Sequence, residues 1–306
     1  MTTLPQPSWW CLEFEPPGEL EESLLWRLET LGIQRVAVGF KPEQPQVRTL
    51  VAWLPEADWP ELERQQLQAA LAAMAEPFGL SLPPLRWRLL PEEDWSLSWK
   101  QHWQPDPVGS GLLILPAWLD HPAEHAQRKA LLIDPGSAFG TGSHPTTRLC
   151  LEALEGTSLQ GALVGDLGCG SGILGIASLA LGAAQVVASD TDTLAVRATA
   201  ENAQLNGVKD QLAVTLGSAE ALESLLQGRR VDLLVCNILA PVLTELTPAF
   251  AGLLGPDGVG LLSGLLVDQA PPLQRHLQNH GWDAELSAEQ GRWGLLTIRR
   301  QGRDVA

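Results

Sequence analysis

The sequence has 306 residues, enough for two domains, and 45% of them are hydrophobic against 18% charged, which excludes an intrinsically disordered chain. Its 36 acidic and 20 basic residues give a net charge of −16, a poor basis for binding a nucleic-acid backbone. The four cysteines form no Cys-x-x-Cys pair, and the N-terminus MTTLPQPSWW lacks the features of a signal peptide. We expect a reduced, cytoplasmic protein whose partners are cations, neutral metabolites or basic proteins.

The first ninety residues alternate between strand-like and helix-like segments. Strands are predicted at 8–15, 33–40, 48–54 and 85–90. A helix is predicted at 19–32, where leucines recur at helical spacing, and a second from Asp58, as N-cap, to Ala75. The turn residues KPEQPQ (41–46) separate the two middle strands. The order βαββαβ is typical of a small ferredoxin-like α+β domain, which we assign to residues 1–92 with either a recognition or a purely structural role.

A segment rich in proline, glycine and tryptophan follows this domain. We interpret residues 93–110 as a linker. Trp95, Trp99 and Trp103 recur every four residues, so part of the segment is compatible with a short helix that packs on a neighbouring domain.

From Ala162 onwards strands and helical patterns alternate, which predicts a Rossmann-like α/β domain with a doubly wound, mostly parallel sheet. We assign this domain to residues 111–306. The uncharged stretch 167–188 is long enough to span a bilayer, but its glycines and the flanking Asp166 and Asp190 favour a buried strand–loop–helix–strand unit. We therefore expect no membrane segment and a ligand site outside the carboxyl ends of the strands.

The first motif with chemical content is Asp166-Leu-Gly168-Cys-Gly170-Ser-Gly172, between a predicted strand and a helix. Glycines let the backbone approach a ligand closely, and the helix N-terminus suits a carboxylate or phosphate. Asp190, 22 residues after Gly168, ends the next strand and can accept hydrogen bonds from both hydroxyls of a ribose. Loop and acid together indicate an adenosine-type ligand.

Two ligands of this type compete for the loop. Gly170-x-Gly172-x-x-Gly175 nominally matches a dinucleotide fingerprint. Asp166, however, would repel a pyrophosphate, whereas it suits a ligand with an ammonium or sulfonium group. S-adenosylmethionine carries both groups, so we expect it as the cofactor, with a dinucleotide or a packing loop that binds nothing as the alternatives.

Asn237, within Cys236-Asn-Ile-Leu-Ala240, ends a later strand and places an amide over the same crevice. An amide oxygen and a neighbouring backbone carbonyl can accept two N–H bonds from a substrate amine and aim its lone pair. We assign Asn237 the catalytic role. An asparagine that merely closes a turn is the alternative interpretation.

The segment 134–147 (DPGSAFGTGSHPTT) is compatible with a mobile lid over the crevice, with Phe139 against the ligand and Thr147 as a polar contact. Asp134 or His144 as a general base is conceivable, although nothing in the spacing requires it.

Two pairs of histidines, His121 with His125 and His276 with His280, have helical spacing. Neither pair has a third ligand in view, so we predict no metal site.

Several of these segments, in this order, resemble the ribosomal protein L11 methyltransferase family (PrmA-like), a class I family. They are DPGSAFGTGSHPTTRLCLEALE, DLGCGSGILGIASLALGA, VASDTD and VCNILAPVLTEL. The resemblance is strongest over 131–270; over 1–90 it rests on the βαββαβ order and its position before the second domain.

The resemblance implies a protein methyltransferase that transfers methyl groups from S-adenosylmethionine to lysine side-chain and N-terminal amines of a large-subunit ribosomal protein. It implies an N-terminal domain that recognises this substrate, and a flexible linker that lets the catalytic domain reach several amines. The implied cofactor-binding residues are Thr147, Gly168, Asp190 and Asn237, with Phe139 and Gly140 in a cofactor-covering loop; the glycine motif itself adds Asp166 and Gly170.

Three other functions remain open. An NAD-dependent oxidoreductase would use the same fold, and a binding protein without turnover would keep the same loop. A related methyltransferase could act on a base amine or a glutamine, but the usual Asn-Pro-Pro-aromatic motif is replaced here by NILA. We expect a monomer that does not bind nucleic acid directly.

Overall fold

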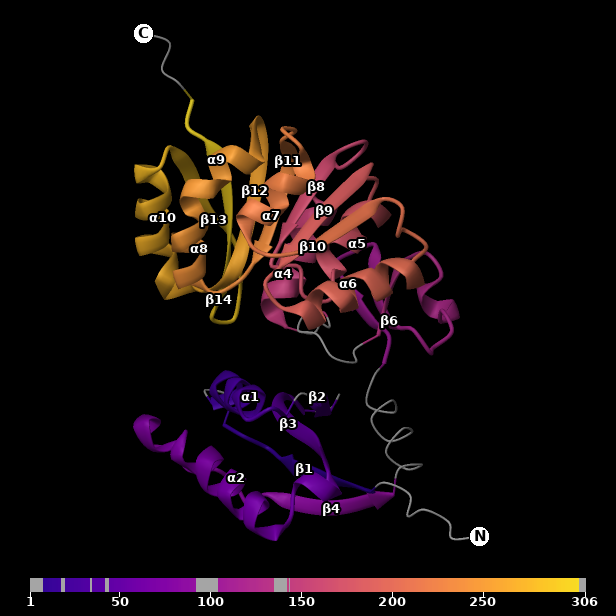
Figure 1. The fold of residues 1–306 in the computed structure, drawn as a ribbon, viewed down its shortest axis with the longest axis vertical. Coiled ribbons are helices and arrows are strands. Elements are labelled where there is room, and N and C mark those ends of the chain that lie inside the picture. Colours follow the sequence, from indigo (N-terminus) through magenta and orange to yellow (C-terminus); the bar gives the residue numbers. More distant parts are fainter. Residues whose placement is uncertain are drawn as a thin grey trace. The chain divides into compact units, whose positions relative to one another are not determined.

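The computed structural model describes residues 8–17, 20–33, 35–41, 44–91, 104–134, 142 and 144–302. The chain forms two compact units, Met1–Trp103 and Gln104–Ala306 (Figure 1). The linker tryptophans Trp95, Trp99 and Trp103 lie outside the described residues. The last part of the range assigned to the linker contains a strand of the second unit, β5 (Asp106–Val108).

The first unit has the predicted order βαββαβ. Its elements are β1 (Ser8–Phe14), α1 (Glu21–Thr30), β2 (Val36–Lys41), β3 (Gln44–Pro55), α2 (Glu61–Ala73) and β4 (Arg86–Pro91). The sheet has the order β2-β3-β1-β4 with every pairing antiparallel. Alternate residues of β1, such as Leu12 and Phe14, join leucines of α1 and α2 in one core. The ferredoxin-like fold is thereby confirmed.

Two local predictions in this unit are wrong. Asp58 does not cap α2: it lies in a 3₁₀ turn (Glu56–Asp58), and the helix begins after Pro60. The residue before a proline is disfavoured in helical conformation, so Trp59 interrupts the helix that the sequence suggested. The turn 41–46 is also shorter than predicted, because β3 already begins at Gln44, which pairs with Lys41.

The second unit contains a seven-stranded sheet of order β10-β9-β8-β11-β12-β14-β13. The strands are β8 (Leu163–Leu167), β9 (Gln185–Asp190), β10 (Leu212–Leu216), β11 (Val231–Asn237), β12 (Leu254–Leu266), β13 (Trp282–Gln290) and β14 (Trp293–Arg300). The first five in the sheet run parallel, and the β13–β14 hairpin adds antiparallel to β12. The order reverses between β8 and β11, where a doubly wound sheet binds its ligand.

Helices cover both faces of this sheet. They are α4 (Pro145–Glu155), α5 (Ile173–Ala180), α6 (Thr193–Leu205), α7 (Ala219–Leu226), α8 (Ala240–Leu246), α9 (Phe250–Leu253) and α10 (Ala270–Asn279). On β11, Leu233 and Val235 face the core shared with α4 and α5, whereas Leu234 and Cys236 face the core shared with α7 to α10.

The apolar stretch 167–188 runs from the end of β8 through the glycine loop and α5 into β9. It is a buried strand–loop–helix–strand unit, as predicted.

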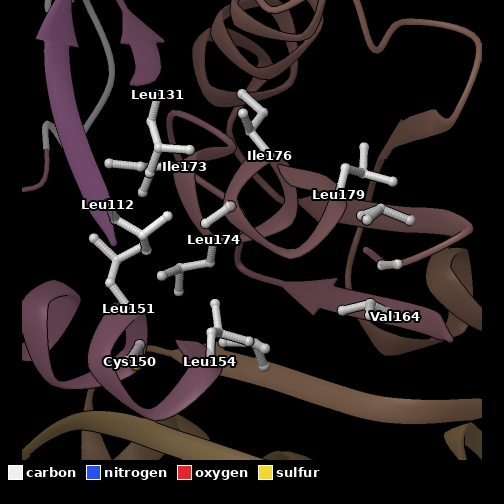
Figure 2. Packing of buried hydrophobic residues seen from close by; sticks show 14 of the residues in the cluster. Leu112, Leu131, Cys150, Leu151, Leu154, Val164, Ile173, Leu174, Ile176 and Leu179 are labelled. Carbon is white, nitrogen blue, oxygen red and sulfur yellow. The ribbon is translucent and has the colours of Figure 1, made fainter. Parts of the chain in front are cut away.

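A small sheet, β5-β6-β7, packs against α5. Its other strands are β6 (Leu112–Pro116) and β7 (Lys129–Ile133). Figure 2 shows Leu112 and Leu131 of this sheet facing Ile173 of α5, with Leu151 of α4 beside them; all are buried. This packing anchors the helix that follows the glycine loop. None of the described helices is both long enough and apolar enough to cross a membrane.

Asn206, just after α6, joins the small sheet to the main domain. Its Oδ1 accepts a hydrogen bond from Leu132 N at 2.9 Å, and its Nδ2 donates to Leu132 O at 2.7 Å. One side-chain amide thus satisfies both backbone groups of an edge residue, which would otherwise be exposed to non-native pairing.

We expect Asn206→Ala to lower the free energy of unfolding by about 1–3 kcal/mol, because both backbone groups of Leu132 lose their partner. Urea denaturation measures the effect, with the exposed neighbour Gln204→Ala as the control. Equal stabilities of the two variants would contradict this role of Asn206.

Candidate functional site

The glycine loop joins β8 to α5 and requires glycine at specific positions. Gly168, Gly170 and Gly172 have φ values of +77°, +54° and +79°, the left-handed region that favours glycine. A Cβ atom on Gly168 would also lie 2.6 Å from Cγ2 of Ile238. The loop therefore brings bare backbone to the carboxyl end of β8, directly before the N-terminus of α5.

Asp166 lies beneath this loop with 1% of its surface exposed. Its Oδ2 accepts a hydrogen bond from Gly175 N at 2.9 Å, whereas its Oδ1 is buried with no hydrogen-bond partner among the described residues. Burial raises the pKa of this carboxyl from 3.8 to about 7; the Gly175 N–H lowers it and the charge of Asp190 raises it. The free oxygen is a site for a donor, preferably a cationic one.

Asp190 ends β9 as predicted, and backbone amides fix its carboxylate. Gly170 N donates to Oδ2 at 2.9 Å, and Asp192 N donates to Oδ1 at 3.0 Å. A carboxylate oxygen can accept more than one hydrogen bond, so both retain capacity for a ligand. Asp190 and the loop that holds Gly170 thus form one rigid, half-buried assembly.

Asn237 is the last residue of β11, the strand beside β8. Its Nδ2 donates a hydrogen bond to Oγ1 of Thr147 on α4, at 3.2 Å. Thr147 is 1% exposed, so its hydroxyl is fixed in the interior. Because the amide nitrogen makes this contact, the side-chain oxygen of Asn237 is the atom left to accept a hydrogen bond from a ligand. Direct contact of Thr147 with a cofactor stays a prediction.

Ile238 holds the strand ends together. Its N–H donates to Ser263 O on β12 at 3.1 Å, and its side chain lies against Gly168. Gly264, at φ +85°, approaches the Ile238 backbone so closely that a Cβ there would collide with it. The ends of β8, β11 and β12 therefore converge, and Asn237 is fixed by its neighbours in the chain.

The segment 134–147 is only partly described. Phe139 and Gly140 lie outside the described residues. Asp134 N donates to Oδ1 of Asn202, and Asp134 itself is exposed. His144 is the N-cap of α4: Thr146 N donates to its Nδ1 at 3.3 Å, and its ring meets the edge of Trp293 with centroids 4.7 Å apart. The structure thus gives His144 a capping role.

Trp293 is a residue that the sequence analysis did not single out. It begins β14, an antiparallel strand whose start reaches the carboxyl ends of the parallel strands. Trp293 reaches His144 only because β14 pairs with β12 in the sheet. The residues around Trp293 in the sequence do not indicate this pairing, so the contact could not be predicted.

The cysteines are all buried and unpaired. Burial, and secondly the charge of Asp166, raises the pKa of the Cys150, Cys169 and Cys236 thiols. These thiols are therefore poor nucleophiles. Among the described residues no group of three or more His, Cys, Asp or Glu side chains could hold a metal ion.

A cavity of about 520 Å³ lies elsewhere, near the other end of α4. Glu152 of α4, Leu261 of β12 and Arg299 of β14 are among its lining residues. None of the predicted site residues lines this cavity, so it is separate from the candidate site at the strand ends.

Comparison with known proteins agrees with this geometry. The family model "Ribosomal protein L11 methyltransferase (PrmA)" matches residues 8–301. The chain belongs to this family. A ribosomal protein L11 methyltransferase of Synechococcus sp. (strain RCC307) is 72% identical over 98% of this chain and 100% of its own length. Its counterpart in Parasynechococcus marenigrum (strain WH8102) is 63% identical over 93% and 99%.

A solved structure supports the same assignment. The crystal structure of a ribosomal protein L11 methylase from Lactobacillus delbrueckii subsp. bulgaricus superimposes with a TM-score of 0.59 at 34% identity. The match covers 65% of this chain and all of that one. The predicted family, the Rossmann-like fold and the methyltransferase class are confirmed, and membership of this class implies use of S-adenosylmethionine.

The buried Asp166 predicts a pH dependence of the ligand-free protein. Because its pKa is higher in the folded state, the stability linked to its bound proton is complete below pH about 4 and is lost as the pH rises through about 7. Relative to Asp166→Asn, the wild type is expected to lose about 3 kcal/mol of unfolding free energy between pH 5 and pH 8. Urea denaturation at both pH values measures this difference, and parallel profiles would contradict it.

Proposed function

We propose that this chain transfers methyl groups from S-adenosylmethionine to amines of ribosomal protein L11, both lysine side chains and the N-terminal amine. The observation that carries the proposal is that the acidic pair and the oriented asparagine lie together at the carboxyl ends of the parallel strands. Asp166 and Asp190 lie at the ends of β8 and β9, and the Thr147-oriented Asn237 ends the adjacent strand β11.

The residues present fit this cofactor. The unpartnered, buried Oδ1 of Asp166 suits the ammonium of the methionine part, and the fixed carboxylate of Asp190 suits the ribose hydroxyls. The glycines at 168 and 170 have positive φ values and no side chain, so the loop offers bare backbone to the ligand. When bound, S-adenosylmethionine supplies a methyl group on a sulfonium that is already a strong electrophile. A pyrophosphate would meet the charge of Asp166 instead, which disfavours the dinucleotide alternative.

The protein's part is to present a neutral amine. A free lysine has a pKa of about 10.4, so its ammonium must lose a proton before it can attack. The Asn237 oxygen accepts an N–H bond from the amine and leaves the nitrogen lone pair free, while Thr147 keeps the amide in this orientation. The proton that the ammonium loses passes to solvent before the amine attacks, and the positive charge of the sulfonium passes to the methylated nitrogen as the thioether leaves. This arrangement works by positioning and desolvation and requires no charged base.

We assign substrate recognition to the first unit, which carries no group of the site described above. The net charge of −16 suits a basic ribosomal protein. The names of the curated relatives and of the Lactobacillus structure favour this substrate over a base amine or a glutamine. We further propose that the enzyme acts as a monomer in the cytoplasm.

Incubation with methyl-labelled S-adenosylmethionine and purified ribosomal protein L11, followed by mass spectrometry, tests the proposal. We expect label on lysine and N-terminal amines of L11. Label confined to RNA or to glutamine, or none at all, would refute the proposed substrate.

Asn237→Ala is expected to lower kcat by about 100-fold, because the amine loses its acceptor, while the cofactor Kd changes little. Thr147→Val, which keeps the shape but removes the hydroxyl, should lower kcat about tenfold through misorientation of the amide. Steady-state kinetics and calorimetry separate the two quantities. Equal losses in kcat and in cofactor affinity would make Asn237 only a cofactor contact.

Asp190→Ala should instead weaken cofactor binding, by about 1–3 kcal/mol, because both ribose hydroxyls and two loop amides lose their acceptor. Calorimetric titration with S-adenosylmethionine measures the change. The exposed Asp210→Ala is a charge-matched control. An Asp190 variant that binds as tightly as this control would exclude Asp190 from the site.

A further inference from the structure

An exposed apolar surface borders the catalytic asparagine. Large hydrophobic side chains that are exposed among the described residues include Leu239, at 65%, and Val242, at 39%. They flank Pro241, which is also exposed. We name Leu239, Pro241 and Val242 the apolar lip; it begins two residues after Asn237. Scattered exposed leucines are ordinary, but a contiguous group beside a site indicates a binding surface.

The backbone forces this lip outward. Ile238 is held inward between Gly168 and Gly264, and its N–H bonds to Ser263 O. The next side chain, Leu239, is exposed and projects away from the core. The Leu239 carbonyl then accepts bonds from Val242 N and Leu243 N at 3.0 and 3.1 Å, which fixes the first turn of α8.

Burial on α8 follows the same division. Ala240 and Leu243 of this helix enter the core, whereas Pro241 and Val242 remain outside. The lip is therefore a fixed feature of the fold, held in place by the packing that fixes Asn237.

We propose that the apolar lip receives the aliphatic arm of the substrate lysine. This inference rests on the proposed function and adds a determinant of which amine is favoured. A lysine carries four methylenes between its backbone and its amine, and such stems pack along apolar surfaces while the nitrogen stays in polar surroundings. The lip begins two residues after Asn237, so the methylenes of a lysine whose amine binds at Asn237 can reach it. Glu245, exposed one turn further along α8, adds a charge that suits a basic segment.

The N-terminal amine of a protein is attached directly to its backbone and has no such arm. The lip should therefore favour lysines and be nearly neutral for the N-terminus. Each methylene that loses its apolar contact costs about fourfold in affinity. Loss of a large part of the lip is thus expected to cost about tenfold.

Leu239→Ser tests this selectivity with ribosomal protein L11 as substrate and with rates at each amine measured by mass spectrometry. We expect kcat/KM for lysines to fall about tenfold and the N-terminal rate to change by less than about twofold. Calorimetry should show an unchanged Kd for S-adenosylmethionine. Leu239→Met should retain the lysine rate. Leu205→Ser, at an exposed leucine that ends α6 near the opposite edge of the sheet, should leave both rates unchanged.

Equal losses at both amines, or no loss at either, would overturn the inference. Gel filtration tests a different occupant of the lip. If Leu239→Ser converts a dimer into a monomer, a second copy of the chain covers the lip, and the inference that the lip receives a lysine is overturned. A wild-type enzyme that labels neither kind of amine would refute the proposed function itself, and that outcome is distinct from a failure of lysine selectivity.

Discussion

The packing of Ile238 between two glycines is the constraint on which the candidate site depends. Gly168 belongs to the loop after β8 and Gly264 to β12, and a side chain on either would collide with Ile238. Because both positions are bare, three strand ends converge around one residue. The glycine loop that follows Asp166 and the strand that carries Asn237 thereby meet at the carboxyl ends of the parallel strands.

The charge state of the candidate site depends on burial. Asp166 lies in the interior, where an ionised carboxylate is costly, so its proton affinity rises until ionisation falls near neutral pH. Asp190, in contrast, is only half-buried, and two backbone amides donate hydrogen bonds to its carboxylate. These two carboxylates on neighbouring strands thus differ in environment, and a cationic ligand near Asp166 would offset the cost of its charge.

Much of the fold and of the candidate site was predictable from the sequence, because the residues that indicate them belong to short, continuous sequence motifs. The glycine motif, Asp190 and Asn237 each lie at a strand end, and strand ends follow from alternating apolar and turn residues. The Thr147–Asn237 contact, the Trp293–His144 contact and the position of Ile238 join residues far apart in the chain. They depend on strand order and side-chain packing, which local patterns do not encode. The N-cap at Asp58 failed because the proline two residues later decided where the helix begins.

The buried cysteines have a consequence for how this protein meets reactive chemicals. Cys150, Cys169 and Cys236 belong to a helix, a loop and a strand of the same unit, and all are sealed inside it as neutral thiols. Electrophiles and peroxides react with thiolates, so they reach these sulfurs only when the domain opens. The rate at which these cysteines are alkylated would therefore report the rate at which this unit opens. A bound ligand that stabilises the closed state should lower that alkylation rate.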